Sequence, residues 1–220
     1  MSWQFLVNNT LGGPLDPVRF GQYDQLMQAC LSTGAYCMID VHNFARWNGR
    51  TIGQNGPGPP TDEPFINLWQ QLAARYAAEE RIMFAIMNEP HDLDIELWAV
   101  TCQKTVTAIR NANATSQLIL LPGTNFASAA TLVSSGSADL LMNITNPDGS
   151  TKGLLLDIHK YLDDNNSGTH GECVMDNVAN FTIVADYLRK VGRQGFVSET
   201  GAGTWSTVRP RSLGRQRDEC

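Results

Sequence analysis

The sequence has no hydrophobic run long enough to cross a membrane, and it carries little charge of either sign. None of its uninterrupted apolar stretches approaches the roughly 20 residues that a membrane-spanning helix needs. Only 17% of the 220 residues are charged, and 22 Asp and Glu outnumber 16 Lys and Arg, which leaves a net charge of −6. Nucleic-acid binding requires a basic surface, which this composition does not supply. We therefore expect neither a membrane partner nor a nucleic-acid partner.

A signal peptide is also missing from the start of the chain, because no basic segment followed by an apolar one comes after Met1. Five Asn-x-Ser/Thr glycosylation acceptors are nevertheless present, where chance predicts about two. They are Asn8, Asn113, Asn143, Asn165 and Asn180. This excess is typical of a protein with a secretory history, so we expect the natural N-terminus to lie upstream of Met1.

Charge is unevenly distributed in one place, at the end of the chain. Four of the 16 cations lie close together there, at Arg209, Arg211, Arg215 and Arg217. From residue 204 onward the only aromatic residue is Trp205, and no period of 2 or 3.6 is present. Such a segment adds little to a hydrophobic core. We expect one domain over residues 1–203 and a disordered, Arg-rich tail over 204–220.

Cysteines are few, but two of them stand close together. Cys30 and Cys37 flank the Ser-Thr-Gly segment 32–34, which favours a turn between a helical and a strand-like stretch. That turn permits a disulfide if the two Cα atoms come within about 7 Å, and two reduced, packed thiols are the alternative. Cys102 lies on the apolar face of an expected helix, where we expect it only to pack. With five cysteines in all, at least one thiol stays unpaired.

Short apolar segments alternate with longer segments of helical periodicity along the chain. The segments that indicate buried strands are 36–42, 83–89, 118–123, 154–161 and 195–200. Apolar residues spaced three and four apart predict helices over 65–76, 98–109 and 181–191, with a shorter one near 26–31. Thr61 and Asp62, just before Pro64, predict a capped start for the helix over 65–76.

Alternating buried strands and helices are typical of a parallel α/β fold. A doubly wound sheet usually carries a glycine-rich phosphate turn after its first strand, and no G-x-G-x-x-G occurs here. A (β/α)8 TIM barrel fits better, although a complete one takes about 250 residues. The expected strands start 35–47 residues apart. We therefore predict an incomplete barrel with about five recognisable strand–helix units.

Polar side chains follow four of the expected strands at the point where each strand ends. They are His42 after the first strand, Asn88 and Glu89 after the second, His159 and Tyr161 after the fourth, and Glu199 after the fifth. In parallel barrels these strand ends meet on one face, which is where active sites are built. Two carboxylates with histidine and tyrosine beside them can serve as general acid, general base and nucleophile. Each residue alone could be an ordinary hydrogen-bonding side chain, but the convergence of four strand ends favours a catalytic site.

A zinc site built from His42, Glu89, His91 and His159 is the alternative interpretation of these residues. The spacings do not match the usual zinc motifs, since neither H-x-H nor H-E-x-x-H occurs. We therefore expect no metal and no other cofactor.

Four motifs resemble those of glycoside hydrolase family 5, in particular its fungal secreted endo-β-1,4-glucanases. They are D-V-H-N-F-A-R-W at 40–47, I-M-N-E-P-H-D at 86–92, D-I-H-K-Y-L-D at 157–163 and S-E-T-G at 198–201. The motifs occur in the family's order, and the resemblance extends over residues 3–203. It implies a (β/α)8 barrel, an extracellular location, and retaining hydrolysis of β-1,4-glucosidic bonds in cellulose-like polysaccharides without a metal.

The resemblance also implies roles for individual residues. Glu89 matches the acid/base, Glu199 the nucleophile, Asn88 the side chain that holds the sugar 2-hydroxyl, and His42, His159 and Tyr161 the polar walls of the site. Trp47 matches a stacking surface for a neighbouring glucose, with ordinary packing as the alternative. Because retaining glycosidases hold their two carboxyl groups about 5–5.5 Å apart, we expect Glu89 and Glu199 to be similarly close.

The chain also departs from the family's pattern at both ends. In the family, two strands precede the first strand found here, and the second supplies an Arg that contacts the nucleophile, a place that Arg19 does not fill. Beyond residue 203 the family continues into a strand bearing a Trp platform. The family's partner for Cys173 is missing too, which leaves Cys173 free or paired with Cys220.

This apparent truncation leaves two hypotheses about function. The first is an active endoglucanase, a monomer acting on β-1,4-glucan. The second is an inactive fragment or sugar-binding remnant of such an enzyme. Because the sheet cannot close, we expect the isolated chain to keep its two glutamates in place and yet to hydrolyse little substrate.

Overall fold

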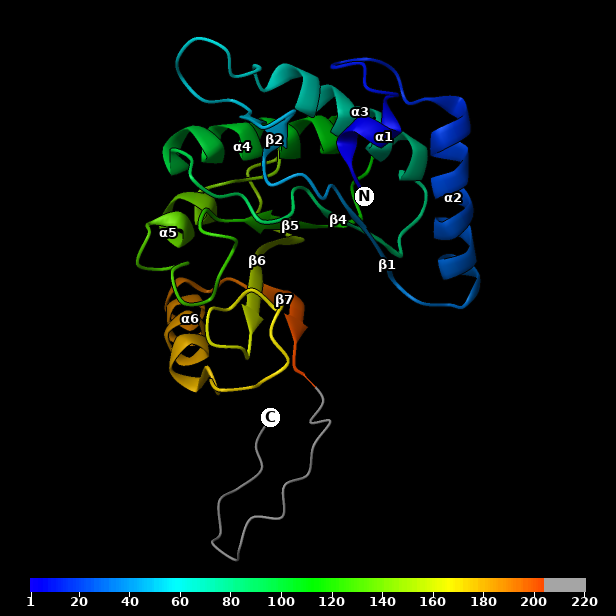
Figure 1. The fold of residues 1–220 in the computed structure, drawn as a ribbon. Coiled ribbons are helices and arrows are strands. Elements are labelled where there is room, and N and C mark those ends of the chain that lie inside the picture. The colour runs from blue at the N-terminus through cyan, green and yellow to red at the C-terminus, as the bar shows by residue number, and fades with distance from the viewer. Residues whose placement is uncertain (204–220) are drawn as a thin grey trace, which may run out of the picture.

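The computed structural model describes residues 1–203 and shows five parallel strands curled into half of a barrel, with helices on the outside (Figure 1). The strands are β1 (Cys37–Asp40), β4 (Ile82–Ala85), β5 (Leu118–Pro122), β6 (Leu154–Tyr161) and β7 (Gly195–Gly201). Each strand pairs in parallel with the next one in this order. Spatial order that follows chain order is the arrangement of a barrel wall. The prediction of an incomplete (β/α)8 TIM barrel is therefore confirmed.

The connections between the strands carry most of the helices. These are α1 (Trp3–Leu6), α2 (Pro17–Ser32), α3 (Glu63–Tyr76), α4 (Ile95–Asn111), α5 (Ser137–Met142) and α6 (Val178–Val191). A small antiparallel pair, β2 (Arg46–Trp47) with β3 (Arg50–Thr51), lies in the connection after β1. Helices α2, α3, α4 and α6 were expected, whereas α1, α5 and the β2–β3 pair are too short to show a period in the sequence.

Helix α2 is much longer than the short helix that the sequence predicted near residues 26–31. It begins at Pro17 because the side chain of Asp16 accepts hydrogen bonds from the backbone N–H groups of Val18 and Arg19, at 3.1 and 2.9 Å. The sequence before residue 26 lacks a clear apolar period, so the cap and the proline start the helix.

The capped start predicted for α3 is wrong in its chemistry. Asp62 precedes the helix in an α-helical backbone conformation, and its side chain makes no hydrogen bond to the first turn. A capping side chain needs an extended backbone to reach those N–H groups. The Asp62 carboxylate instead accepts hydrogen bonds from Lys104, at 2.8 Å, and from Thr101, at 3.5 Å, and so ties α3 to α4.

The two faces of the curled sheet bury apolar side chains unequally. The main core lies between the sheet and the outer helices, where Trp69 and Trp98 are fully buried and donate hydrogen bonds to the carbonyls of Ile86 and Pro122. A separate small cluster of Met83, Ala85 and Leu120, with Met38 and Leu118 against it, lies apart from this core. Because side chains alternate along a strand, these residues mark the inner face of the half-barrel.

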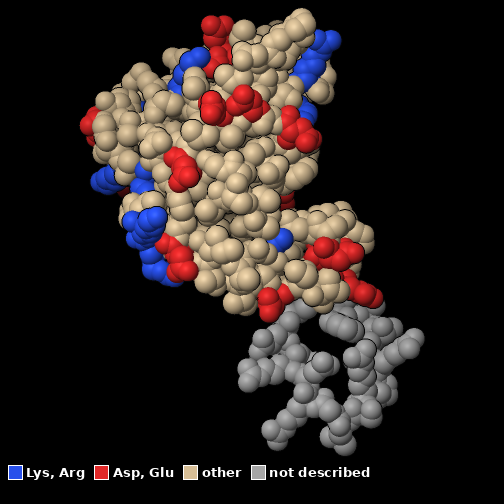
Figure 2. Space-filling view, turned by 90° about the vertical axis from the view of Figure 1, so that its left-hand side faces the viewer, with Lys and Arg blue, Asp and Glu red and all other residues tan. Residues whose placement is uncertain are grey.

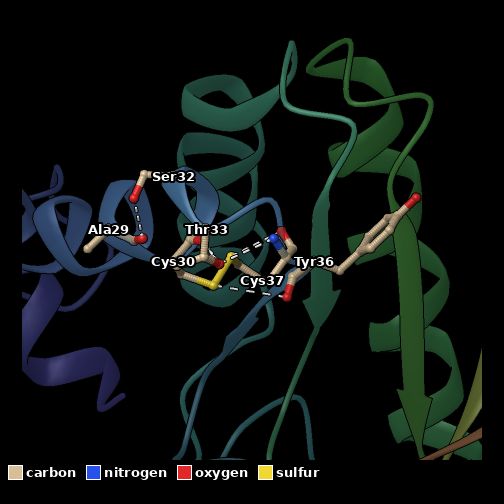
Figure 3. The surroundings of a disulfide bond; sticks show 7 residues. Ala29, Cys30, Ser32, Thr33, Tyr36 and Cys37 are labelled. Carbon is tan, nitrogen blue, oxygen red and sulfur yellow. Dashed lines mark hydrogen bonds between the residues drawn. A yellow bond between two sulfur atoms is a disulfide. The ribbon is translucent and has the colours of Figure 1, made fainter.

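A disulfide joins Cys30, in α2, to Cys37, at the start of β1, with Cα atoms 6.2 Å apart (Figure 3). The predicted disulfide is therefore confirmed, and it links the two ends of the turn that connects α2 to β1. Cys102 is buried on α4 as a free thiol, and burial raises the pKa of that thiol. Cys173 has no disulfide partner within residues 1–203, and both Cys220 and the predicted tail lie outside the described residues.

The described residues also bear on membrane spans and on the distribution of surface charge. Within residues 1–203 no helix is both long and apolar enough to cross a membrane. On the face shown in Figure 2, Lys and Arg side chains are interspersed with Asp and Glu.

Candidate active site

The carboxyl-terminal ends of the strands bring most of the predicted site residues together. Glu89 follows β4, whereas His159 and Tyr161 lie on β6 and Glu199 lies on β7. The pairing of β6 with β7 shifts by one residue at Ile158, so that His159 lies directly opposite Glu199. A β-bulge of this kind re-aims side chains next to the irregularity.

Glu89 is held in an unusual backbone conformation. Its φ is +45°, in the left-handed region that residues with a Cβ rarely adopt. The preceding residue is anchored, because the N–H of Asn88 donates to the carbonyl of Val41 at 2.9 Å. Strained backbone of this kind is concentrated at functional sites, where the surrounding structure enforces it.

His159 lies between the two glutamates. Its Nδ1 is 3.0 Å from Oε1 of Glu89 and 3.7 Å from Oε2 of Glu199. One carboxylate oxygen of Glu89, one of Glu199 and a ring nitrogen of His159 all lie within 4.8 Å of one another. Burial opposes protonation of the imidazole, but the hydrogen bond to Glu89 and the charges of Asp157 and Glu199 outweigh burial and raise the pKa of His159.

Tyr161 contacts the second glutamate directly, since its hydroxyl donates a hydrogen bond to Oε1 of Glu199. The loop after β6 fixes the backbone of Tyr161: its N–H donates to Oδ1 of Asn166, and its carbonyl accepts from Nδ2 of Asn177, both at 2.8 Å. Gly168 lies against the tyrosine ring, where a Cβ would come within 2.4 Å of it. Burial and the hydrogen bond to Glu199 both raise the pKa of Tyr161.

The remaining predicted residues are placed in different ways. Asn88 is 3% exposed, and within residues 1–203 its Nδ2 has no hydrogen-bond partner. His42 is half exposed and forms a 2.8 Å contact from Nδ1 to the carboxylate of Asp40. Trp47 is 7% exposed and packs edge-on against Trp3, with ring centroids 4.8 Å apart.

The residues of the zinc alternative do not assemble. Of its four members, only Glu89 and His159 are in contact. His42 is occupied with Asp40, and His91 contacts Asp92 through Nδ1 at 2.7 Å and stacks on Phe126. Each imidazole thus has a hydrogen-bonding partner within the described residues.

Sequence reasoning overlooked two polar residues beneath the site, Asp157 on β6 and Ser198 on β7. The hydroxyl of Ser198 donates a hydrogen bond to Oδ1 of Asp157. Oδ2 of Asp157 lies 3.8 Å from Nε2 of His159. The sequence did contain a signal for Asp157. It lies two residues before His159 and four before Tyr161 on one strand, so the three side chains share a face of that strand.

Comparisons with known proteins agree on one family. A model of the cellulase family (glycosyl hydrolase family 5) matches residues 1–217. Endoglucanase EG-II of Hypocrea jecorina is 55% identical over 204 residues, which are 92% of this chain and 48% of that protein. The manganese dependent endoglucanase Eg5A of Phanerodontia chrysosporium is 44% identical over 210 residues, which are 94% of this chain and 53% of that protein.

Solved structures show the same likeness. The crystal structure of Cel5A (EG2) from Hypocrea jecorina matches with a TM-score of 0.89 and 55% identity, covering 92% of this chain and 61% of that one. The structure of XacCel5A in complex with cellopentaose matches with a TM-score of 0.83 and 30% identity, covering 92% of this chain and 64% of that one. The chain spans about half the length of the curated relatives that it matches. Because the family model matches almost the whole length of this chain, the chain belongs to the cellulase family, glycosyl hydrolase family 5.

Proposed function

We propose that the chain carries the active site of a retaining endo-β-1,4-glucanase, with Glu89 as acid/base and Glu199 as nucleophile. The spacing of the two carboxylates is the observation that carries this proposal: one oxygen of each lies within 4.8 Å of the other. Retaining enzymes hold the pair about 5–5.5 Å apart, whereas inverting enzymes need about 6.5–9.5 Å to admit a water molecule. The short separation supports double displacement.

In the first step Glu89 protonates the glycosidic oxygen while a carboxylate oxygen of Glu199 bonds to the anomeric carbon, and the bond to the leaving sugar breaks. In the second step Glu89 takes a proton from water, which attacks the anomeric carbon and releases Glu199. The hydrogen bond from Tyr161 occupies Oε1 of Glu199 and leaves Oε2 for the attack. A carboxylate held in one orientation loses less freedom in the transition state.

Asn88 supports the assignment from the substrate's side. Among the described residues its Nδ2 is a buried donor without a partner, and such groups are rare in folded proteins because they cost free energy. We infer that the sugar 2-hydroxyl accepts this hydrogen bond, a contact that strengthens in the transition state of glycoside hydrolysis.

The substrate and the location follow from the relatives and from the covalent chemistry. Relatives named as endoglucanases, and a structural neighbour with bound cellopentaose, support a β-1,4-glucan substrate for this chain. The Cys30–Cys37 disulfide supports an extracellular location, because disulfides persist in oxidising compartments.

The test is release of reducing sugar from carboxymethyl-cellulose by the chain, compared with Glu89→Gln and Glu199→Gln. Each substitution keeps the side-chain shape and removes the acid or the nucleophile, so we expect a loss of at least about 100-fold. Glu80→Gln is the matched control, because Glu80 is exposed in the connection between α3 and β4. Wild-type rates in both active-site variants would contradict the proposal.

A trapping experiment tests the nucleophile even if turnover is slow. A 2-deoxy-2-fluoro cellobioside with a good leaving group slows the second step more than the first, so the covalent intermediate accumulates. We expect mass spectrometry to find the sugar on the peptide that contains Glu199. A sugar on any other residue would contradict the assignment, and cellopentaose binding without labelling or hydrolysis would favour the sugar-binding remnant.

A further inference from the structure

Within residues 1–203, the pair of glutamates has one ion-pair partner. His159 contacts both carboxylates, at 3.0 and 3.7 Å, and in this part of the chain no Lys or Arg nitrogen lies within 4.0 Å of either one. Two carboxylates this close repel each other, and a positive charge between them offsets that repulsion. Among the described residues, the positive charge beside the two glutamates is therefore that of one imidazole when it is protonated.

Asp157 lies on the opposite side of the same imidazole. It precedes His159 by two residues on β6, so both side chains project from one face of the strand. Its side chain is 2% exposed, and its Oδ2 lies 3.8 Å from Nε2 of His159. A buried carboxylate needs a partner of opposite charge, because removing a charge from water costs several kcal/mol.

The two nitrogens of His159 thus face acidic groups on opposite sides. Nδ1 is directed at Glu89 and Glu199, and Nε2 is directed at Asp157. A neutral imidazole carries one N–H and can serve only one side, whereas an imidazolium carries two. Only the charged form directs an N–H to both sides, with a hydrogen bond to Glu89 and an ionic contact with Asp157.

We propose that Asp157 is a positioning residue that keeps His159 charged and oriented between Glu89 and Glu199, so that the imidazolium supplies the positive charge of the site. Ser198, the residue displaced at the bulge in β7, completes the arrangement by donating its hydroxyl to Oδ1 of Asp157. The consequence for catalysis rests on the proposed function. The charge state of His159 can be tested without any turnover.

The described residues place several titratable groups against this imidazole or its partners. They are Glu89 after β4, Glu199 on β7, Asp157 and Tyr161 on β6, and Asp40 on β1, which forms an ion pair with His42. Burial raises the pKa of Asp157 to about 6, even though the charge of His159 and the bond from Ser198 act in the opposite direction. At neutral pH the carboxylate is therefore ionised, and its charge acts on His159.

The experiment is a pH titration of the four histidines by NMR in the 220-residue chain, with each signal assigned by a His→Gln variant. We expect the ¹⁵N shifts of His159 at pH 7 to be those of an imidazolium. In Asp157→Asn, which keeps the side-chain shape and removes the charge, we expect the pKa of His159 to fall by at least about one pH unit. A neutral His159 at pH 7, or an unchanged pKa in folded Asp157→Asn, would overturn the proposal.

The chain contains its own matched control. Asp163 and His170 form a second buried-carboxylate–histidine contact, at 3.2 Å, in the loop after β6. Asp163→Asn also removes a buried carboxylate, and it should leave the pKa of His159 unchanged, while Asp157→Asn should lower that pKa. A purely structural effect of losing a buried aspartate would lower the pKa of His159 in both variants.

A second measurement covers the case in which Asp157→Asn does not fold. In the wild-type chain, the signals of His159 should show an additional inflection as the Asp157 carboxyl ionises near pH 6. An inflection supports direct coupling of the two groups, and its absence overturns the proposal. Since neither measurement uses a substrate, a failure of the proposed glucanase activity would be recognised separately in the hydrolysis assay.

Discussion

The hydroxyl of Tyr161 on β6 donates a hydrogen bond to Oε1 of Glu199 on the neighbouring strand β7. The loop that follows β6 holds the tyrosine in place through Asn166, Asn177 and Gly168. The orientation of one glutamate therefore depends on a loop that acts on it through Tyr161.

Tyr161→Phe removes the hydroxyl that orients Glu199. Because one lost donor at a reacting group costs about 100-fold, we expect a loss of that order in kcat on carboxymethyl-cellulose and slower labelling by the fluorosugar. Tyr187→Phe is the control, since the Tyr187 hydroxyl also donates to a carboxylate, that of Asp139, between α6 and α5. Equal activities in the two variants would contradict a role for Tyr161.

Gly168→Ala tests whether the loop positions the tyrosine. Gly168 has a φ of +71°, and an added Cβ would come within 2.4 Å of the Tyr161 ring. We expect the free energy of unfolding to fall by about 1–3 kcal/mol in urea titrations, with a displaced Tyr161. Gly171→Ala is the control in the same loop, because among residues 1–203 no atom lies within 4 Å of its added Cβ. Equal stabilities of the two variants would argue against close packing at Gly168.

The disulfide predicts both a thiol count and a loss of stability. Of the five cysteines, three thiols or fewer should react in oxidised, unfolded protein, and all five should react after reduction. A double Cys30→Ser, Cys37→Ser variant should lose about 2 kcal/mol of unfolding free energy, because the unfolded chain is no longer constrained. Five reactive thiols without reductant would contradict the bond.

Asp163 predicts a pH dependence of stability. Burial opposes its ionisation, but hydrogen bonds from the backbone of Gly168 and from His170 and Ser167 lower its pKa to about 2. A pKa below the unfolded value of about 4 stabilises the folded state above pH 4, and this contribution is lost as the pH falls toward 2. Asp163→Asn should therefore be less stable than wild type at pH 7, and the difference should shrink between pH 4 and pH 2.

Urea unfolding at several pH values provides the measurement for Asp163. Asp164→Asn is the matched control, because the neighbouring Asp164 side chain is largely exposed. A stability difference between wild type and Asp163→Asn that stays constant from pH 7 to pH 2 would show that the carboxylate charge does not act in this way.

The strong periodic signals of the sequence predicted most of the fold. Strand β6 occupies the predicted range 154–161, and α3, α4 and α6 cover the predicted helical faces. Helices α1 and α5 and the β2–β3 pair escaped prediction, because each of these elements is too short to show a helical or strand period in the sequence. The cap at Asp62 failed because its backbone conformation and its contact with Lys104 are decided by α4, which lies far along the chain.

The sequence by itself determined the curled parallel sheet, the Cys30–Cys37 bond, and the strand ends that carry Glu89, His159, Tyr161 and Glu199. The strands and their polar ends follow from local patterns of apolar and polar residues, and the disulfide follows from the turn between its two cysteines. Such local features can be recognised in the sequence. Only the tertiary structure decided how the side chains meet: the bulge sets Glu199 opposite His159 and brings Ser198 onto Asp157. A shift of one residue in strand pairing leaves no trace in composition or periodicity, because it arises from the contact between two strands 34 or more residues apart in the chain.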